Sequence, residues 1–138
     1  RLCQEELTVF VGCGKQKTWH KTQAKYLYIG RYFRLCLSLA RRLTSDDHIY
    51  ILSAKHGVLS LDREIEPYNV KLTELPAADR RAWCDRVRRQ VERVSQGRRR
   101  VFICSREYTR GLEGTHVLPK VGIGRQMQWI EQVLRSVK

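Results

Sequence analysis

Residues 49–59 read IYILSAKHGVL, and this stretch indicates the fold. Residues 49–53 form a short apolar run, which predicts a buried strand. The strand ends in small residues, and a cation, an imidazole and a glycine follow at once as Lys55, His56 and Gly57. Open α/β sheets bind their ligands where a strand ends in a polar loop. We therefore expect the functional site of the chain at the end of this strand.

A second stretch, residues 64–69, adds carboxylates, an aromatic ring and an amide in the letters EIEPYN. Glycoside hydrolysis uses carboxylates beside an oxocarbenium-like centre, and enzymes that act on a base take it out of the stack into a pocket. The set therefore fits cleavage of an N-glycosidic bond. We expect Glu66 to be the active carboxylate, because the proline after it fixes the backbone that leads to Tyr68 and Asn69. Glu64 remains the alternative, since the two glutamates share a face if the segment is extended.

Each of these residues also has a structural interpretation. A glutamate in a basic protein is often only a salt-bridge partner, and His56 could simply cap the strand end. Lys55 could bind phosphate only, or form a Schiff base at an abasic sugar if its pKa were lowered. As catalytic residues we predict Glu66, Asn69 and His56. As substrate-binding residues we predict Cys13, Gly14, Lys15, Lys17, Lys55, Glu64, Tyr68, Arg125 and Gln126.

Glycine-rich turns begin two further segments. Residues 12–17 read GCGKQK after an apolar strand, and residues 122–126 read GIGRQ before the last helix. Glycines let the backbone approach a ligand, and N–H groups beside cations suit a phosphate. The alternative is a tight turn with surface lysines. Neither turn has the spacing of a P-loop or a dinucleotide fingerprint, so we expect no cofactor. We expect both turns to face residues 64–69 across one cleft.

Strand-like and helix-like segments alternate along the chain. Apolar runs predict strands at 7–11, 49–53, 101–104 and 115–118. Apolar spacing and caps predict helices at 26–42 and 79–95, a short helix from Ser105 to about Arg110, and a last helix after residue 121 with Met127, Ile130, Val133 or Leu134, and Val137 inward. The alternation predicts one α/β domain over residues 1–138, with a central, mostly parallel sheet of about four strands flanked by helices.

Three local features carry further expectations. One face of the first long helix should hold Tyr28, Tyr32, Cys36, Leu39 and Leu43. Asp79 is placed to cap the second long helix, and Gly97 to end it. Trp19 lies in a polar, basic loop at residues 18–25. It either stacks on a base or wedges into a duplex, or it packs over the core.

Charge is the strongest global property of the chain. Its 27 Lys and Arg residues oppose 14 Asp and Glu residues, which gives a net charge of +13. This excess is more than solubility needs and predicts a polyanionic partner, of which nucleic acid is the commonest. We expect DNA, held through its phosphate backbone and a flipped base, and no obligate protein partner. The second long helix offers the best backbone-binding surface, with Arg81, Arg88 and Arg89.

The cysteines indicate a reduced environment. There are five, an odd number, and no Cys-x-x-Cys pair: Cys3, Cys13, Cys36, Cys84 and Cys104. This pattern favours a cytoplasmic protein over a disulfide framework, and it offers no paired ligands for a metal. We expect Cys36, Cys84 and Cys104 to be small core residues. No apolar run approaches the roughly 20 residues of a membrane helix, and no signal-peptide pattern is present, so no membrane is expected.

Several motifs resemble a family of small bacterial and phage domains of unknown function. They are FVGCGKQK at 10–17, AKYLYIGRYF at 24–33, LSAKHGVL at 52–59, IEPYNVKL at 65–72 and GIGRQMQW at 122–129. The resemblance covers nearly the whole chain, with the motifs in the same order. The central block is also similar to YaaA-type peroxide-stress proteins, which bind DNA; those are longer and contain a helix-hairpin-helix that has no obvious counterpart here.

The segment at Glu66 is also similar to uracil-DNA glycosylases, in which the acid of an Asp-Pro-Tyr motif activates water. Here Glu replaces Asp, Glu64 and Ile65 replace the preceding Gly-Gln, and the motif follows the second strand rather than the first. Glycosylases that excise modified phage bases are similar to the same small family. The resemblance implies a DNA glycosylase that acts on a modified or damaged base, in phage defence. The alternative is a non-catalytic DNA-binding stress protein.

Overall fold

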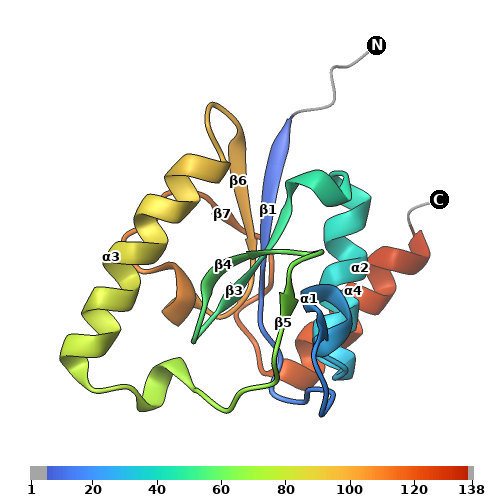
Figure 1. Cartoon of the computed structure of the whole chain (residues 1–138). Coiled ribbons are helices and arrows are strands. Elements are labelled where there is room, and N and C mark those ends of the chain that lie inside the picture. The colour runs from blue at the N-terminus through green and yellow to red at the C-terminus, as the bar shows by residue number, and fades with distance from the viewer. Residues whose placement is uncertain (1–5, 137–138) are drawn as a thin grey trace.

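The computed structural model describes residues 6–136, and a five-stranded sheet lies at its centre (Figure 1). The strand order is β4-β3-β1-β6-β7. The strands are β1 (Leu7–Gly12), β3 (Ile49–Ser53), β4 (Gly57–Ser60), β6 (Arg99–Ile103) and β7 (Thr115–His116). Neighbouring strands are parallel except β3 and β4, which are antiparallel. The predicted α/β domain with a mostly parallel sheet is confirmed, and β4 is an additional strand within the loop expected after residue 53.

Helices cover both faces of this sheet (Figure 1). α2 (Arg31–Leu43), α4 (Ile123–Ser136) and the short α1 (Ala24–Leu27) pack on one face, and α3 (Ala77–Val94) packs on the other. Successive strand side chains point to opposite faces. Val9 and Val11 therefore enter the core under α2, whereas Phe10 enters the core under α3. All three side chains are fully buried, so β1 is covered on both faces and the sheet is the middle layer of the molecule.

The first predicted long helix is wrong as a single helix. α1 ends at Leu27, and α2 begins only after Gly30, whose backbone is extended at φ −70° and ψ 152°. The break arises because Tyr28 pairs with Lys17 in a β-bridge, which overrides the helical spacing of the sequence. Tyr28 is therefore not on α2. The rest of the predicted face does lie on α2 and packs against the core, as Tyr32, Cys36, Leu39 and Leu43.

The second long helix forms as α3, but its predicted cap is wrong. Pro76 holds the N-cap position without a side-chain hydrogen bond, and Asp79 lies inside the first turn. Its charge still suits the positive end of the helix dipole there. The predicted apolar stripe is confirmed, since Trp83, Val87 and Val91 are buried and Val94 packs against them. The chain turns away after the helix, where Gly97 has φ +69°.

The last third of the chain follows its prediction in the main, but the strand expected at 115–118 ends at His116, and Met127, predicted to face inward, is only half-buried. Ser105 caps a 3₁₀ helix, η3 (Arg106–Thr109), by accepting a hydrogen bond from the backbone N–H of Glu107. α4 buries Ile130 fully and packs Val133 and Leu134 partly against the core. Val137, the last residue predicted to face inward, lies outside the described residues.

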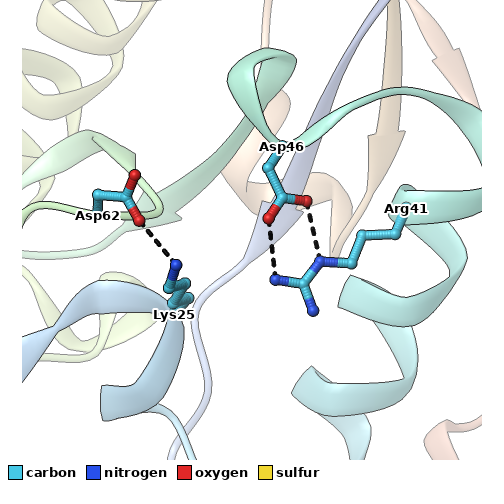
Figure 2. A network of polar contacts seen from close by, with 4 residues as sticks. All are labelled: Lys25, Arg41, Asp46 and Asp62. Atoms are coloured by element: carbon cyan, nitrogen blue, oxygen red, sulfur yellow. Dashed lines mark hydrogen bonds and ion pairs between the residues drawn. The ribbon is translucent and has the colours of Figure 1, made fainter.

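A two-stranded antiparallel sheet, β2 (Thr22–Gln23) with β5 (Glu64–Ile65), ties the segment before α1 to the segment after β4. Two ion pairs reinforce this side of the molecule (Figure 2). Lys25 Nζ lies 2.8 Å from Asp62 Oδ1, and the guanidinium of Arg41 in α2 donates two hydrogen bonds to Asp46. Trp19 stands clear of this anchored region with 94% of its surface exposed, so it does not pack over the core.

The cysteines expected in the core lie there. Cys36 and Cys104 are buried, and Cys84 packs half-buried against the core under α3. Burial raises the pKa of the Cys36 thiol to about 12, so this thiol stays protonated at neutral pH. Within residues 6–136, none of the helices has the length and apolar character that crossing a membrane requires.

Candidate functional site

The strand order creates a crevice at the carboxyl ends of β1 and β6. After β1 the chain returns to the sheet on one side as β3, and after β6 it returns on the other side as β7. Open α/β sheets bind ligands in the crevice where neighbouring connections diverge in this way. The two loops meet here, because Cys13 Sγ after β1 lies 3.4 Å from the hydroxyl of Tyr108 in η3. The topology therefore selects this edge as the candidate site.

A pocket of about 400 Å³ opens at this crevice. We name it the lysine pocket, because three lysines line it and none of its lining residues within 6–136 is acidic. Its lining comprises Cys13, Gly14, Lys15, Lys17, Asn69, Val70, Lys71, Leu72, Thr73, Tyr108 and Ile123. The two glycine-rich turns and the 64–69 segment therefore each contribute to this pocket, through Gly14, Ile123 and Asn69.

Three hydroxyl groups are linked beneath Lys17. The hydroxyl of Tyr68 lies 2.5 Å from that of Tyr28 and 2.7 Å from Ser53 Oγ. Ser53 Oγ also accepts the backbone N–H groups of Lys55 and His56 at 3.2 and 3.0 Å. These N–H groups occupy both lone pairs of the serine oxygen, so its own proton is donated to Tyr68. Burial raises the pKa of both tyrosine hydroxyls far above its usual value, and the cluster is neutral.

Lys17 lies over the rings of this cluster. Its Nζ is 4.6 Å from the ring centroid of Tyr68 and 5.8 Å from that of Tyr28, and it donates a hydrogen bond to the carbonyl of Lys15 at 3.3 Å. No carboxylate among residues 6–136 forms an ion pair with it. Burial lowers the pKa of its ammonium group, against a smaller opposing effect of Cys13. Lys17 is therefore an unpaired cation that gives up its proton more readily than an exposed lysine.

His56 and Lys55 also lie against Tyr68. The His56 ring contacts the Tyr68 ring edge-to-face at 5.4 Å, and Lys55 Nζ lies 6.0 Å from that ring's centroid. Burial lowers the pKa of His56, and the nearby cations Arg63, Lys55 and Arg86 lower it further. These effects favour the neutral ring, and its Nε2 is buried without a hydrogen-bond partner within residues 6–136. Its catalytic role stays a prediction, because it touches the tyrosine rather than the pocket lining.

The structure does not bring the two predicted carboxylates into the pocket lining. Glu64 is exposed in β5, opposite Gln23 of β2. Glu66 is also exposed, in the irregular segment that continues to Asn69 in the lining. Arg125 is exposed in the first turn of α4 and lies outside the lysine pocket. The predicted roles of these three side chains are therefore not supported by proximity in the free protein.

A second hollow, of about 840 Å³, lies beyond the start of α4. Its lining comprises Tyr32, Cys104, Ser105, Arg106, His116, Leu118, Pro119, Lys120, Val121, Gly122, Ile123 and Gln126. Gln126 has a structural role here, since its side chain accepts a hydrogen bond from Tyr32 at 2.6 Å and donates one to the carbonyl of Pro119 at 3.0 Å. Ile123 is 59% exposed and borders both this hollow and the lysine pocket.

Sequence reasoning missed several side chains of the site, among them Tyr108, Lys71 and Tyr28. Tyr108 lines the pocket from η3, and Lys71 lines it beside Asn69. Tyr28 supports the pocket through its hydroxyl bond to Tyr68. Tyr108 follows the end of β6, so the rule that placed the site after β3 also points to it. Tyr28 carried no such signal, because its spacing suggested an ordinary core position on a helix.

The arginines predicted to bind the DNA backbone lie on the exposed side of α3. Arg81 borders a hollow of about 320 Å³ together with Arg80 and Arg110. Arg88 forms an ion pair with Asp85 at 2.9 Å, and Arg89 is exposed. The surface is therefore strongly basic, and its contact with DNA stays a prediction.

Comparison with known proteins adds one match. The model of a family of unknown function, DUF6884, matches residues 8–132, which include the whole sheet except Leu7 of β1 and every residue that lines the lysine pocket. No curated protein matches the chain.

Proposed function

Since the chain belongs to the DUF6884 family, whose function is unknown, we propose a function from its site. The protein binds DNA and hydrolyses the N-glycosidic bond of a modified or damaged base held in the lysine pocket. The observation that carries this proposal is the lysine pocket itself, a cationic pocket with an amide and an aromatic ring at the ligand-binding edge of the sheet.

Charge supports a polyanionic ligand. The chain carries a net charge of +13, and the lysine pocket has three cations and no acidic residue among its described lining. Of the three lining lysines, Lys71 pairs with Glu74, which is outside the lining. Asp46 and Asp62 pair with Arg41 and Lys25 instead (Figure 2). Lys15 and Lys17 are left without such partners within residues 6–136. Two unpaired ammonium groups in one pocket attract phosphate.

The other lining residues support the binding of a base. The Asn69 side chain offers both a donor and an acceptor for a base edge, and the Tyr108 ring offers a stacking surface. Val70 and Leu72 add apolar surface beside them. Enzymes that act on a base use this combination to hold it once it has left the stack.

The proposed reaction needs a carboxylate to activate water or stabilise the sugar cation. Glu66 serves this purpose in our proposal. It lies three residues before Asn69 in the same irregular segment, and it is exposed in the free protein. It therefore has to approach the sugar when DNA is bound, and catalytic contacts often close only in the complex.

Released bases provide the direct test. We would incubate the protein with natural, phage and chemically modified DNAs, identify released bases by mass spectrometry, and detect abasic sites as alkali-labile breaks. We expect Glu66→Gln to lower the rate of release about 100-fold or more, because it removes the carboxylate charge, and Glu64→Gln as the matched control to retain activity. Absence of release from the whole panel, or full activity of Glu66→Gln, would contradict the proposal.

One observation favours a second function, DNA binding without catalysis. The described lining of the lysine pocket contains no carboxylate, as a pure phosphate-binding site requires. On this alternative, Glu66→Ala leaves the biological function and DNA affinity unchanged, whereas reversing the charges on α3 abolishes both. Base release that depends on Glu66 excludes the alternative.

A further inference from the structure

Lys17 has the surroundings of a nucleophilic amine. Lys17 lines the lysine pocket, and its Nζ has no ion-pair partner within residues 6–136. Lys71, by contrast, has Glu74 within 3.6 Å of its Nζ. A lysine becomes nucleophilic when burial or neighbouring cations favour its neutral form. Burial favours the neutral form of Lys17, and Lys15 lines the same pocket.

The aromatic ring beneath this amine suits a cationic intermediate. The Tyr68 ring, 4.6 Å from Lys17 Nζ, cannot move freely, because its hydroxyl is held by Tyr28 and Ser53. The face of an aromatic ring attracts a cation. A neutral amine that becomes a positively charged iminium would therefore gain this attraction as the reaction proceeds. The pocket also needs no carboxylate for such a reaction, in agreement with its described lining.

We infer that Lys17 forms a Schiff base with the aldehyde of an abasic deoxyribose, so that the lysine pocket also acts as an abasic-site lyase. The inference rests on the proposed binding of DNA in this pocket, and it concerns the sugar that remains once a base has gone.

The reaction balances without a cofactor. The neutral amine of Lys17 adds to C1′ of the ring-opened sugar, the carbinolamine takes up a proton and loses water, and a protonated C=N bond remains. C2′ then loses a proton to water, its electron pair forms the C2′=C3′ bond, and the C3′–O bond breaks with departure of the 3′ phosphate. Hydrolysis of the C=N bond returns the free amine and leaves an unsaturated aldehyde on the DNA.

Borohydride trapping tests the inference independently of base release. The intact protein is mixed with an oligonucleotide that already carries one abasic site, and sodium borohydride reduces any C=N bond to a stable secondary amine. We expect a covalent adduct on a denaturing gel, with the added mass on the peptide that contains Lys17. An oligonucleotide with no abasic site is the matched control for the substrate.

Conservative variants separate the amine from the charge. Lys17→Arg keeps the cation but removes the primary amine, and we expect it to lower the adduct at least 100-fold while DNA binding in a gel-shift assay persists. Lys21→Arg is the matched control and should retain the adduct, because this exposed lysine does not line the pocket. A wild-type protein that binds the abasic oligonucleotide but gives no adduct, an adduct undiminished in Lys17→Arg, or an adduct mapped to another residue overturns the inference. None of these results bears on whether the protein releases a base.

Discussion

At the scale of single residues, the hydroxyl of Ser53 holds together the end of β3. It is fully buried and accepts the backbone N–H groups of Lys55 and His56 while it contacts the hydroxyl of Tyr68. Removal of this oxygen takes the acceptor from both backbone N–H groups and leaves the Tyr68 hydroxyl with Tyr28 alone. Ser53 therefore fixes the loop that follows the strand as well as the ring beneath Lys17.

We predict that Ser53→Ala lowers the free energy of unfolding by about 1–3 kcal/mol, because a buried polar group left without its partner costs that much. Urea unfolding followed by fluorescence measures the change. Ser60→Ala is the control, since this serine is exposed at the end of β4 and its loss should be nearly neutral. A Ser53→Ala protein as stable as the wild type would show that the hydroxyl network makes no net contribution to the free energy of unfolding.

The residues of the site were predictable where they follow strand ends. Cys13, Gly14, Lys15 and Lys17 were identified from a glycine-rich turn, and the pocket contains all four. Chemical type alone was a poor guide for the carboxylates. The letters EIEPYN do not reveal which side chains turn inward, and the β2–β5 pairing leaves Glu64 and Glu66 exposed. This pairing joins segments about 40 residues apart, which local patterns cannot encode.

At the scale of elements, α3 is joined to the sheet at Gly57. This glycine begins β4 with φ +76°, and a Cβ there would overlap the side chain of Gln90 in α3. The same Gln90 oxygen accepts the backbone N–H of Val58 at 3.0 Å. The start of β4 therefore requires a residue with no side chain, for its backbone conformation and for the close approach of the helix.

Two glycine substitutions separate these causes. Gly97 also has a positive φ of 69°, but nothing lies near the position of its missing Cβ. We predict that Gly97→Ala costs about 1 kcal/mol of stability from the backbone conformation alone. Gly57→Ala should cost a further ~0.5–1.5 kcal/mol, because Gln90 must move and lose its hydrogen bond. Equal losses in urea unfolding would contradict the role given to Gln90.

The elements themselves were predictable in proportion to their periodicity. The apolar run at 49–53 predicted a strand, and the spacing of Trp83, Val87 and Val91 predicted a helix. The structure contains both. The helix expected at 26–42 failed, because the β-bridge from Lys17 to Tyr28 competes with the helical spacing there. β4 was missed since its four residues follow a turn rich in polar groups and pair antiparallel with β3.

At the scale of the whole molecule, α3 and the pair α2 and α4 cover opposite faces of the sheet, so the basic surface of α3 can be changed without touching the other side (Figure 1). If Arg81, Arg88 and Arg89 contact phosphates, their joint replacement by Glu should weaken DNA binding. It should also lower the slope of log affinity against log salt concentration by about 2–3, since each lost phosphate contact on duplex DNA contributes ~0.9.

The matched control reverses three exposed cations away from α3, which are Arg34 in α2, Arg135 in α4 and Lys21 before β2. Both triple variants change the net charge by the same amount, so a general effect of charge would weaken binding equally. We expect the control to retain most of the salt slope of the wild type, as measured by fluorescence anisotropy with a labelled duplex. Equal loss in the two variants would show that α3 is not the surface that contacts the backbone.

The position of Ile123 has a consequence for the variety of ligands that this fold can accept. Its side chain borders both the lysine pocket and the second hollow, is more than half exposed, and lies at the first residue of α4 rather than in the core. We expect a smaller residue here to enlarge both hollows, of about 400 and about 840 Å³, with little loss of stability. In the proposed function, we expect the size of this one side chain to determine whether the lysine pocket admits a base with a bulky substituent. The sheet and both helical layers would stay unchanged.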